Sequence, residues 1–372
     1  MCRLYLALIL VFSTVLSASA QQRGVWSAAG AQSEYKYKYG SNPNQQNRGN
    51  NRGNYTQAAG RAGAGKQQSS SVYFGDRSDI ADSVKSDGQV RRFVVHVPPG
   101  YGRKPCPVII ALHGAGMNID SMRGLTLLDV PADQAGFMVV YPQGVGGGWN
   151  AGGLKPNSSA DDVKFMADLL AYLPTKYNID PRSIYLCGIS NGGQMVEMLA
   201  CSEVSRQIAA IGVVAITGYT SVCEACRSKR PIPTALFMGT EDPLVPREDA
   251  AAKKLGKFGE SFGVGDLALT PMIAKYADIM TAQQAEEFWA SHNGVSSPRT
   301  EYMPDKDPRD GCRVKRETYG SGVRELIVYT VEGGGHTWPG GLGYLAEERL
   351  GRTTNDINAS QLLVLFFRSH TL

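Results

Sequence analysis

Histidine, cysteine and charge are all sparse in this chain of 372 residues. It holds five histidines and seven cysteines, and 19% of its residues are charged. No spacing of His and Cys is typical of a zinc site, so we expect no metal. No apolar run reaches the roughly 20 residues that a membrane-spanning helix needs, so we expect no membrane span. Because histidines are so few, each can be weighed as a catalytic base.

The first 20 residues have the pattern of a secretion signal. Arg3 supplies a positive charge, Leu4 to Leu16 form a short apolar core, and Ala18-Ser19-Ala20 is a small-residue cleavage site. We therefore expect residues 1–20 to be a signal peptide. The mature protein is then expected to be secreted and extracellular, or periplasmic in a bacterium.

Residues 21–71 are rich in Gly, Asn, Gln, Ser and Ala and nearly devoid of aliphatic side chains. Such a segment cannot bury enough apolar surface to fold, so we expect a disordered basic tail. Residues 1–71 contain eight Lys or Arg and one acid, so the overall charge of +4 arises here and residues 72–372 carry −3. The tail is either a solubilising linker or an arm that contacts an anionic surface. We expect no nucleic-acid binding, because that needs a basic patch on a folded element.

Residues 72–372 are long enough for one large domain with a sizeable core. Short continuous apolar runs, typical of buried parallel strands, alternate with segments of helical period. This order predicts an α/β domain with a doubly wound, mostly parallel sheet and helices on both faces. The predicted strands are 91–97, 108–112, 137–141, 183–187, 209–216, 233–238 and 325–331; the predicted helices are 161–177, the segment after Ser190, 281–292 with a capping box, and 358–368.

One strand-to-helix junction carries a Gly-x-Ser-x-Gly motif, Gly188-Ile189-Ser190-Asn191-Gly192. Small residues on both sides of a serine allow a sharp turn that lifts the hydroxyl clear of the sheet, where it can act as a nucleophile. In a chain with 43 glycines the motif also arises readily by chance. Ser190 is therefore a catalytic candidate only if a base, an orienting acid and an oxyanion hole occur at suitable places.

The first of these partners follows the predicted strand 108–112. The turn His113-Gly114-Ala115-Gly116 can aim a backbone N–H at an oxyanion. The second donor is the N–H of Asn191, directly after the serine. The N–H groups of Ala115 and Asn191 are thus the predicted oxyanion hole.

The predicted base is His336, which follows the last strand on a loop with three glycines. It is identified by elimination. His96 lies inside a strand, His370 lies near the chain end, His292 ends a helix, and His113 belongs to the glycine turn.

The orienting acid is expected after the strand 233–238, where Glu241 and Asp242 are adjacent. Only one of two adjacent side chains in an extended segment points inward. We favour Asp242, because the following Pro243 stiffens its turn. Serine, acid and histidine then occur in the chain order of an α/β-hydrolase.

Two tryptophans stand close to these strand ends. Trp149 and Trp338 are candidates for a substrate-binding wall, and packing in the core accounts for either of them equally well.

Six cysteines remain after removal of the signal, and export permits disulfides. Cys201 is a candidate partner for Cys223 or Cys226, and Cys187 is expected to be a buried free thiol. We expect the pair Cys223 and Cys226 to have a structural role, with no zinc bound.

Several short motifs follow the predicted strands: Ala111-Leu112-His113-Gly114, Tyr141-Pro142-Gln143-Gly144, Trp149-Asn150-Ala151-Gly152, Asp161-Asp162-Val163, Gly188-Ile189-Ser190-Asn191-Gly192-Gly193, Gly239-Thr240-Glu241-Asp242 and Glu332-Gly333-Gly334-Gly335-His336-Thr337-Trp338-Pro339-Gly340. With these motifs, the chain from about Gly88 to the C-terminus resembles the secreted polyhydroxybutyrate depolymerase family of esterases, which is close to feruloyl and acetylxylan esterases. The resemblance implies an α/β-hydrolase fold with Ser190 as nucleophile, His336 as base and Asp242 as orienter. Two departures are the absence of a cysteine after Asn293-Gly294, which leaves the partner of Cys312 open, and a long segment 250–272, a surface loop or a lid.

The sequence therefore predicts a serine esterase that needs no cofactor and hydrolyses carboxylic esters through an acyl-enzyme. For the substrate, the resemblance implies a polyester or oligoester of 3-hydroxy acids. The alternatives are a feruloyl or acetylxylan esterase acting on plant polysaccharide, and a non-catalytic protein that binds a surface through its basic tail.

Overall fold

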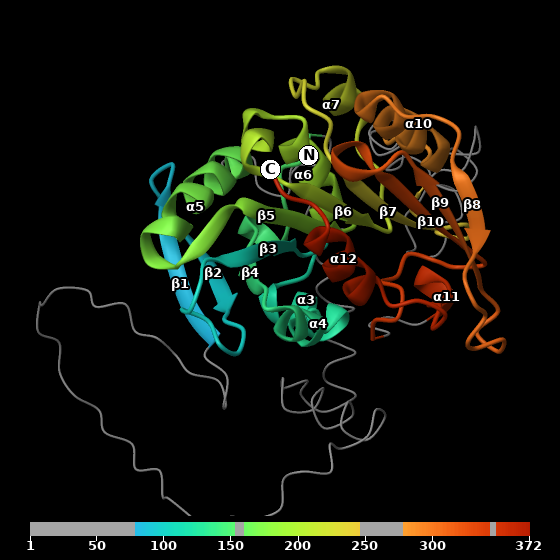
Figure 1. The fold of residues 1–372 in the computed structure, drawn as a ribbon, viewed down its shortest axis with the longest axis horizontal. Helices are drawn as coiled ribbons and strands as arrows, with labels where there is room; N and C mark the ends of the chain where they lie inside the picture. Colours follow the sequence, from blue (N-terminus) through green and yellow to red (C-terminus); the bar gives the residue numbers. More distant parts are fainter. Residues whose placement is uncertain (1–78, 153–159, 246–277, 343–346) are drawn as a thin grey trace, which may run out of the picture.

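The computed structural model describes residues 79–152, 160–245, 278–342 and 347–372 (Figure 1). The predicted signal peptide 1–20, the tail 21–71 and the segment 250–272 lie outside the described residues. The described strands are β1 (Asp79–Ser86), β2 (Gln89–His96), β3 (Cys106–Leu112), β4 (Met138–Pro142), β5 (Ile179–Ile189), β6 (Ala210–Val214), β7 (Thr234–Gly239), β8 (Arg299–Tyr302), β9 (Arg313–Tyr319) and β10 (Leu326–Glu332). The helices are α3 (Ile119–Thr126), α4 (Asp129–Ala135), α5 (Asp162–Lys176), α6 (Asn191–Ala200), α7 (Thr220–Glu224), α10 (Ala282–Asn293), α11 (Glu347–Leu350) and α12 (Ala359–Arg368), with short 3-10 turns at Val145–Gly147, Glu203–Gln207 and Gly322–Arg324.

All these strands form a single sheet in the order β1-β2-β4-β3-β5-β6-β7-β10-β9-β8. The central strands from β4 to β10 pair in parallel, whereas β1, β2, β8 and β9 pair antiparallel at the two edges. The predicted mostly parallel sheet is thus confirmed, and every predicted strand and helix is present with ends shifted by a few residues. Strands β1, β8 and β9 and the helices α3, α4, α7 and α11 were not predicted.

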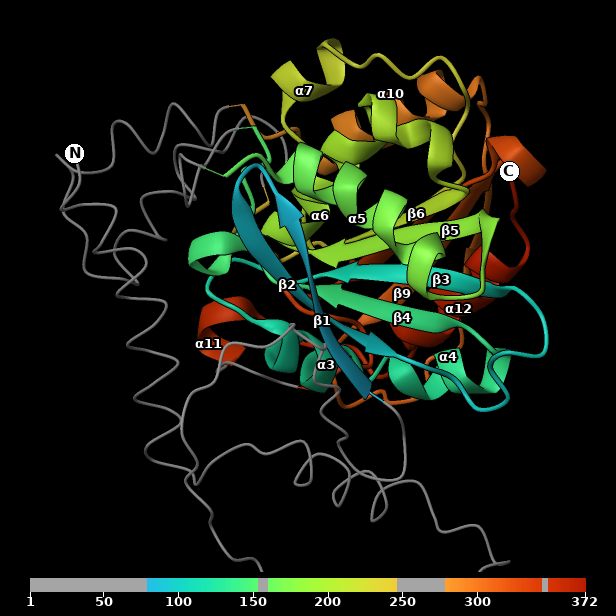
Figure 2. The same cartoon turned by 90° about the vertical axis from the view of Figure 1, so that its left-hand side faces the viewer.

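Helices cover both faces of the sheet. Figure 2 shows α5, α6, α7 and α10 on one side of it and α3, α4 and α12 on the other. Alternate residues of a strand point to opposite faces. Along β3, Val108 and Ile110 accordingly pack in the core beneath α5 and α6, and Ile109 packs in the core beneath α12.

Helix α10 begins with the predicted capping box. Thr281 Oγ1 accepts a bond from the N–H of Gln284 (3.1 Å), and Gln284 Oε1 accepts one from the N–H of Thr281 (2.8 Å). These bonds satisfy two backbone donors that have no partner within the helix.

We expect Thr281→Ala to lower the free energy of unfolding by about 1 kcal/mol, because the Ala side chain cannot accept the bond from Gln284. Thermal unfolding should show a melting temperature lower by about 2 °C. Ser291→Ala, which removes an exposed hydroxyl near the other end of the same helix, is the matched control. An equal effect of both variants would contradict the capping role.

Two predictions for the cysteines are confirmed. Cys201, at the end of α6, forms a disulfide with Cys226. Cys187 is a buried free thiol, and within the described residues the thiols of Cys106, Cys223 and Cys312 are also free and buried. The disulfide joins the end of α6 to the loop after α7.

A partly buried ion cluster joins the first two strands to α3 and α4. His96 Nδ1 lies 2.7 Å from Asp79 Oδ1, and His96 Nε2 lies 2.8 Å from Asp133 Oδ1. Arg123 Nη2 donates to Asp79 Oδ2 (2.7 Å) and to Asp129 Oδ2 (2.8 Å). Burial by itself lowers the pKa of His96, but the hydrogen bonds to Asp133 and Asp79 outweigh it and raise that pKa to about 9. The imidazole is therefore protonated at neutral pH.

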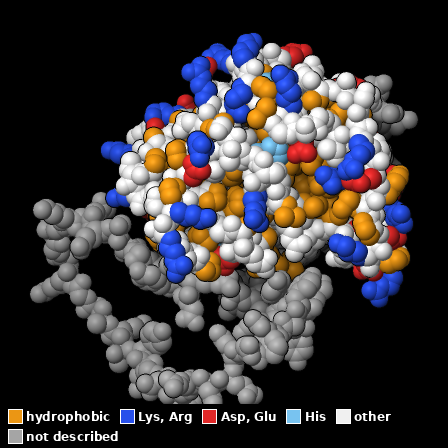
Figure 3. Space-filling view, in the orientation of Figure 1, with side chains coloured by type: hydrophobic (Ala, Val, Ile, Leu, Met, Phe, Trp, Pro, Cys, Tyr) orange, Lys and Arg blue, Asp and Glu red, His pale blue; other side chains and the backbone are white. Residues whose placement is uncertain are grey.

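Basic side chains are dispersed over the face seen in Figure 3, where Lys and Arg alternate with acidic, apolar and neutral groups. No helix among the described residues is both long and apolar enough to cross a membrane.

Candidate active site

Ser190 lies in the sharp turn between β5 and α6, with backbone angles φ 55° and ψ −129°. Such a conformation is strained for a residue with a Cβ. The flanking glycines make the turn possible. A Cβ on Gly188 would lie 2.5 Å from the backbone carbon of Gly192, and one on Gly192 would lie 2.3 Å from the carbonyl oxygen of Leu112. The sequence Gly-x-Ser-x-Gly is thus required here by close backbone contacts.

The glycine turn after β3 lies against Ser190. A Cβ built on Gly114 would be 3.4 Å from Ser190 Cβ. The turn is held by bonds from Gly116 N to Gly147 O (2.7 Å) and from Met117 N to Gly114 O (3.2 Å). Ala115 lies in this turn, and Asn191 is the first residue of α6. The structure therefore brings both predicted oxyanion donors to the turns that border Ser190.

Asp242 and His336 are in direct contact. His336 Nδ1 lies 2.9 Å from Asp242 Oδ2, and the two side chains are 3% and 1% exposed. The other carboxylate oxygen, Asp242 Oδ1, accepts bonds from the N–H groups of Leu244 (2.7 Å) and Val245 (3.2 Å). Because the carboxylate is fixed by its own turn, it can hold the imidazole in the tautomer with hydrogen on Nδ1.

The loops that carry the acid and the histidine are also bonded to each other. The N–H of Glu241 donates to Gly334 O (2.8 Å), and the N–H of Gly333 donates to Thr240 Oγ1 (2.8 Å). Strands β5, β6, β7 and β10 are parallel neighbours, so their carboxyl ends lie along one edge of the sheet. Ser190, Asp242 and His336 each follow one of these ends.

The other histidines make structural contacts. His113 Nε2 accepts the N–H of Gly144 (2.9 Å), and burial lowers the pKa of His113 to about 4. His292 bonds the carbonyl of Arg230, and His370 lies 3.1 Å from Glu325.

Trp149 and Trp338 are both buried, with 0% and 1% of their surface exposed. The indole of Trp149 donates to the carbonyl of His113 (2.9 Å), and that of Trp338 donates to Ser360 Oγ (3.0 Å). These contacts agree with the core-packing alternative for both residues.

Sequence reasoning missed the buried partners of the site loops. Asn191 bonds the backbone of Trp149 through both ends of its amide, and Asp162 binds Arg91 and the N–H of Asn150. Four of these residues stand in the sequence motifs and Arg91 begins a predicted strand, but no local pattern indicates the contacts between them.

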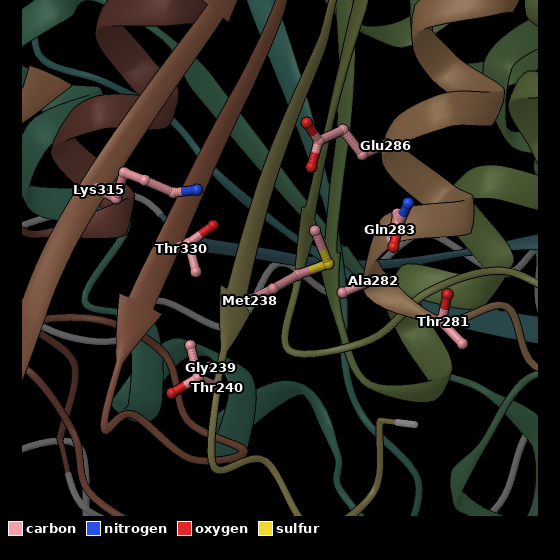
Figure 4. A pocket seen from close by; sticks show the side chains of 9 residues that line it. All are labelled: Met238, Gly239, Thr240, Thr281, Ala282, Gln283, Glu286, Lys315 and Thr330. Carbon is pink, nitrogen blue, oxygen red and sulfur yellow. The ribbon is translucent and has the colours of Figure 1, made fainter. Parts of the chain in front are cut away.

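A cavity of about 180 Å³ lies between α10 and the carboxyl ends of β7 and β10. Figure 4 shows Met238, Thr330 and Lys315 on three adjacent strands, facing Gln283 and Glu286 of α10. Thr240, two residues before Asp242, also lines it. Lys315 Nζ is paired with Glu317 (2.8 Å).

Within the described residues no group of three or more His, Cys, Asp or Glu side chains is arranged to hold a metal ion. The carboxyl edge of the sheet carries a hydroxyl in a strained turn, neighbouring backbone N–H groups and a fixed carboxylate–imidazole pair. This set of groups suits acyl transfer.

Comparison with known proteins identifies the family. Residues 91–229 match the family described as esterase PHB depolymerase. The chain is 31% identical over 304 residues to the putative esterase NocK of Nocardia uniformis subsp. tsuyamanensis, covering 78% of this chain and 83% of that protein. It is 32% identical over 268 residues to feruloyl esterase B of Neurospora crassa, covering 67% and 84%. Among solved structures, an acetyl xylan esterase from Aspergillus awamori has a TM-score of 0.49 at 16% identity, covering 69% of this chain and 94% of that one.

The chain is a carboxylic ester hydrolase with an α/β-hydrolase fold, and it belongs to the esterase PHB depolymerase family.

Proposed function

We propose that the chain is an exported serine esterase that works through a Ser190, His336 and Asp242 triad. His336 takes the proton of Ser190 as its hydroxyl attacks the ester carbonyl, and Asp242 holds the imidazole tautomer. The N–H groups of Asn191 and Ala115 stabilise the tetrahedral oxyanion. The alcohol leaves with the proton from His336, and water then releases the acid from the acyl-enzyme.

One observation carries this proposal. A serine with φ 55° and ψ −129° follows β5, at the sheet edge where a buried carboxylate lies 2.9 Å from an imidazole. Strain of this kind at a serine, flanked by glycines that touch neighbouring backbone, supports a nucleophile better than an ordinary turn residue.

For the substrate we propose an ester of 3-hydroxy acids, as in polyhydroxybutyrate, in soluble or amorphous form. Feruloyl or acetyl esters of plant polysaccharide are the second candidate. The likeness to feruloyl esterase B supports this second candidate. So do the Thr, Gln and Lys side chains that line the cavity beside β7, because they suit a hydroxyl-rich alcohol.

A panel of p-nitrophenyl acyl esters, methyl ferulate, acetylated xylan and amorphous polyhydroxybutyrate tests the substrate. We expect kcat/KM to be higher for the short acyl esters and the polyester than for methyl ferulate and acetylated xylan. Faster cleavage of methyl ferulate or acetylated xylan would instead support the second candidate.

A fluorophosphonate label tests whether the chain is catalytic at all, because it reacts with an activated serine. We expect one label per chain, at Ser190. Absence of labelling would favour the non-catalytic alternative, in which the basic tail, residues 21–71, contacts an anionic surface. Export through residues 1–20 is part of the same proposal, and detection of the protein outside the producing cells checks it.

A further inference from the structure

Trp149 connects two parts of the site that are far apart in the sequence. Its backbone N–H donates to Asn191 Oδ1 (2.7 Å), and its carbonyl accepts a bond from Asn191 Nδ2 (3.0 Å). Its indole Nε1 donates to the carbonyl of His113 (2.9 Å). Trp149 is therefore bonded both to the residue after Ser190 and to the residue that begins the glycine turn.

The two bonds to Asn191 fix the orientation of its amide, because oxygen and nitrogen each face the partner that they require. Asn191 is the first residue of α6, and its own N–H is the donor next to Ser190. The position of that donor is thus tied to the backbone of Trp149.

His113 ties the same loop to the glycine turn from the other side. Its Nδ1 donates to Gly114 O (2.8 Å), and its Nε2 accepts the N–H of Gly144 (2.9 Å). The neutral imidazole has one donor and one acceptor, which matches these two bonds. Because its pKa is lowered to about 4, His113 keeps both bonds at neutral pH.

A buried ion pair holds the loop in place behind Trp149. Arg91 Nη2 donates to Asp162 Oδ1 (2.6 Å), and Asp162 Oδ2 accepts the N–H of Asn150 (2.7 Å). The side chains of Arg91 and Asp162 are 4% and 1% exposed, and the guanidinium lies 4.0 Å from the ring centre of Phe165. A loop anchored in this way has little freedom to move.

We propose that Trp149 is a positioning residue that sets the separation of the two oxyanion donors, the N–H groups of Ala115 and Asn191. The inference rests on the proposed function, in which these two groups bind the tetrahedral oxyanion. The indole fixes the start of the turn that carries Ala115, and the backbone of Trp149 fixes Asn191. Donors held at a set spacing before the reaction stabilise the transition state without reorganisation.

The test compares Trp149→Phe with Trp289→Phe. Both indoles are fully buried, and each donates one hydrogen bond, from Trp149 to His113 O and from Trp289 to Glu197 Oε1 (2.8 Å). The two substitutions therefore remove the same atoms. Only Trp149→Phe also removes a hydrogen bond to the glycine turn, the bond to His113 O. Melting temperatures measured for both show whether they cost similar stability.

For Trp149→Phe we expect kcat for p-nitrophenyl butyrate to fall by about 10- to 100-fold, with KM changed by less than about threefold, because a misplaced donor affects the transition state more than the ground state. Inhibition by butylboronic acid, which forms a tetrahedral adduct with serine, should weaken by a similar factor, whereas inhibition by butyrate should not change. Trp289→Phe should leave kcat and both inhibition constants within about twofold of the unmodified protein.

An unchanged kcat in folded Trp149→Phe would overturn the inference, as would an equal loss in Trp289→Phe. If Trp149→Phe does not fold, Asn191→Ala decides, since it removes the two bonds to the Trp149 backbone and is expected to lower kcat and boronate affinity together. Ser190→Ala distinguishes failure of the proposed function from failure of the inference about Trp149. If Ser190→Ala stays active, the proposed function fails, whatever the effect of Trp149→Phe.

Discussion

Replacing Ser190 by Ala is expected to lower kcat for ester hydrolysis on the order of 10⁶-fold. The alanine variant keeps the strained turn but has no hydroxyl to attack the ester or to carry the acyl group. His336 and Asp242 then have no nucleophile to activate, so only binding and the oxyanion donors contribute to the residual rate. Steady-state rates on p-nitrophenyl butyrate measure this loss.

The control for this prediction is Ser183→Ala, within β5, the strand that ends directly before Ser190. Ser183 Oγ donates to Asp180 Oδ2 (2.8 Å), near the amino end of β5 and away from the carboxyl edge. We expect it to keep its activity within about twofold. A Ser190→Ala variant with more than about a hundredth of the original kcat would rule out Ser190 as the nucleophile.

The stability of the protein is expected to fall by roughly 3 kcal/mol as the pH rises from about 6.5 to about 9, through the ion cluster around His96. The pKa of His96 is raised from its ordinary 6.5 to about 9 in the folded protein by its bonds to Asp133 and Asp79, which outweigh burial. Below pH 6.5 both the folded and the unfolded chain hold the proton, so the contribution is complete. Above that pH the unfolded chain loses the proton first, and the contribution disappears as the pH passes the folded pKa.

Denaturant titrations from pH 6 to pH 10 measure this effect, and two variants isolate it from other groups that titrate there. His96→Gln leaves Asp79 and Asp133 facing a neutral group, so we expect the free energy of unfolding to be lower by about 3–5 kcal/mol at pH 6. In this variant the free energy of unfolding should also depend less steeply on pH at alkaline pH. His292→Gln, which replaces a histidine bonded to a backbone carbonyl, should keep the slope of the unmodified protein. Equal slopes in all three proteins would contradict the assignment to His96.

Much of the fold was predictable because its central strands are continuous apolar runs. These runs located the carboxyl edge of the sheet, and Ser190, Asp242 and His336 stand directly after three of them. Strands β8 and β9 were missed for a physical reason. β8 is the edge strand and β9 lies next to it, and both Arg299–Tyr302 and Arg313–Tyr319 are largely polar, as suits strands whose surface is partly exposed to solvent. These strands are held by backbone hydrogen bonds, which do not require apolar side chains, so their sequences show no apolar pattern typical of a strand.

The contacts that support the site were less accessible to sequence reasoning. Asp161 and Asp162 both read as acids at the start of a helix. The structure separates their roles, since Asp161 caps α5 through the N–H of Lys164, whereas Asp162 turns inward to the buried Arg91. Likewise, nothing in the local sequence of Trp149 indicates that its backbone lies against Asn191, because that contact depends on how two distant segments meet.

The place of Asp79 in the ion cluster sets a limit for protein engineering. Asp79 is the first residue of β1, and its two carboxylate oxygens bind His96 and Arg123 separately. A shortened version of the chain that starts after this residue would leave the buried His96 and the partly buried Arg123 with one carboxylate fewer, at the outer strand of this side of the sheet. Fusion partners and affinity tags should therefore be joined upstream of residue 79, with the aspartate itself retained.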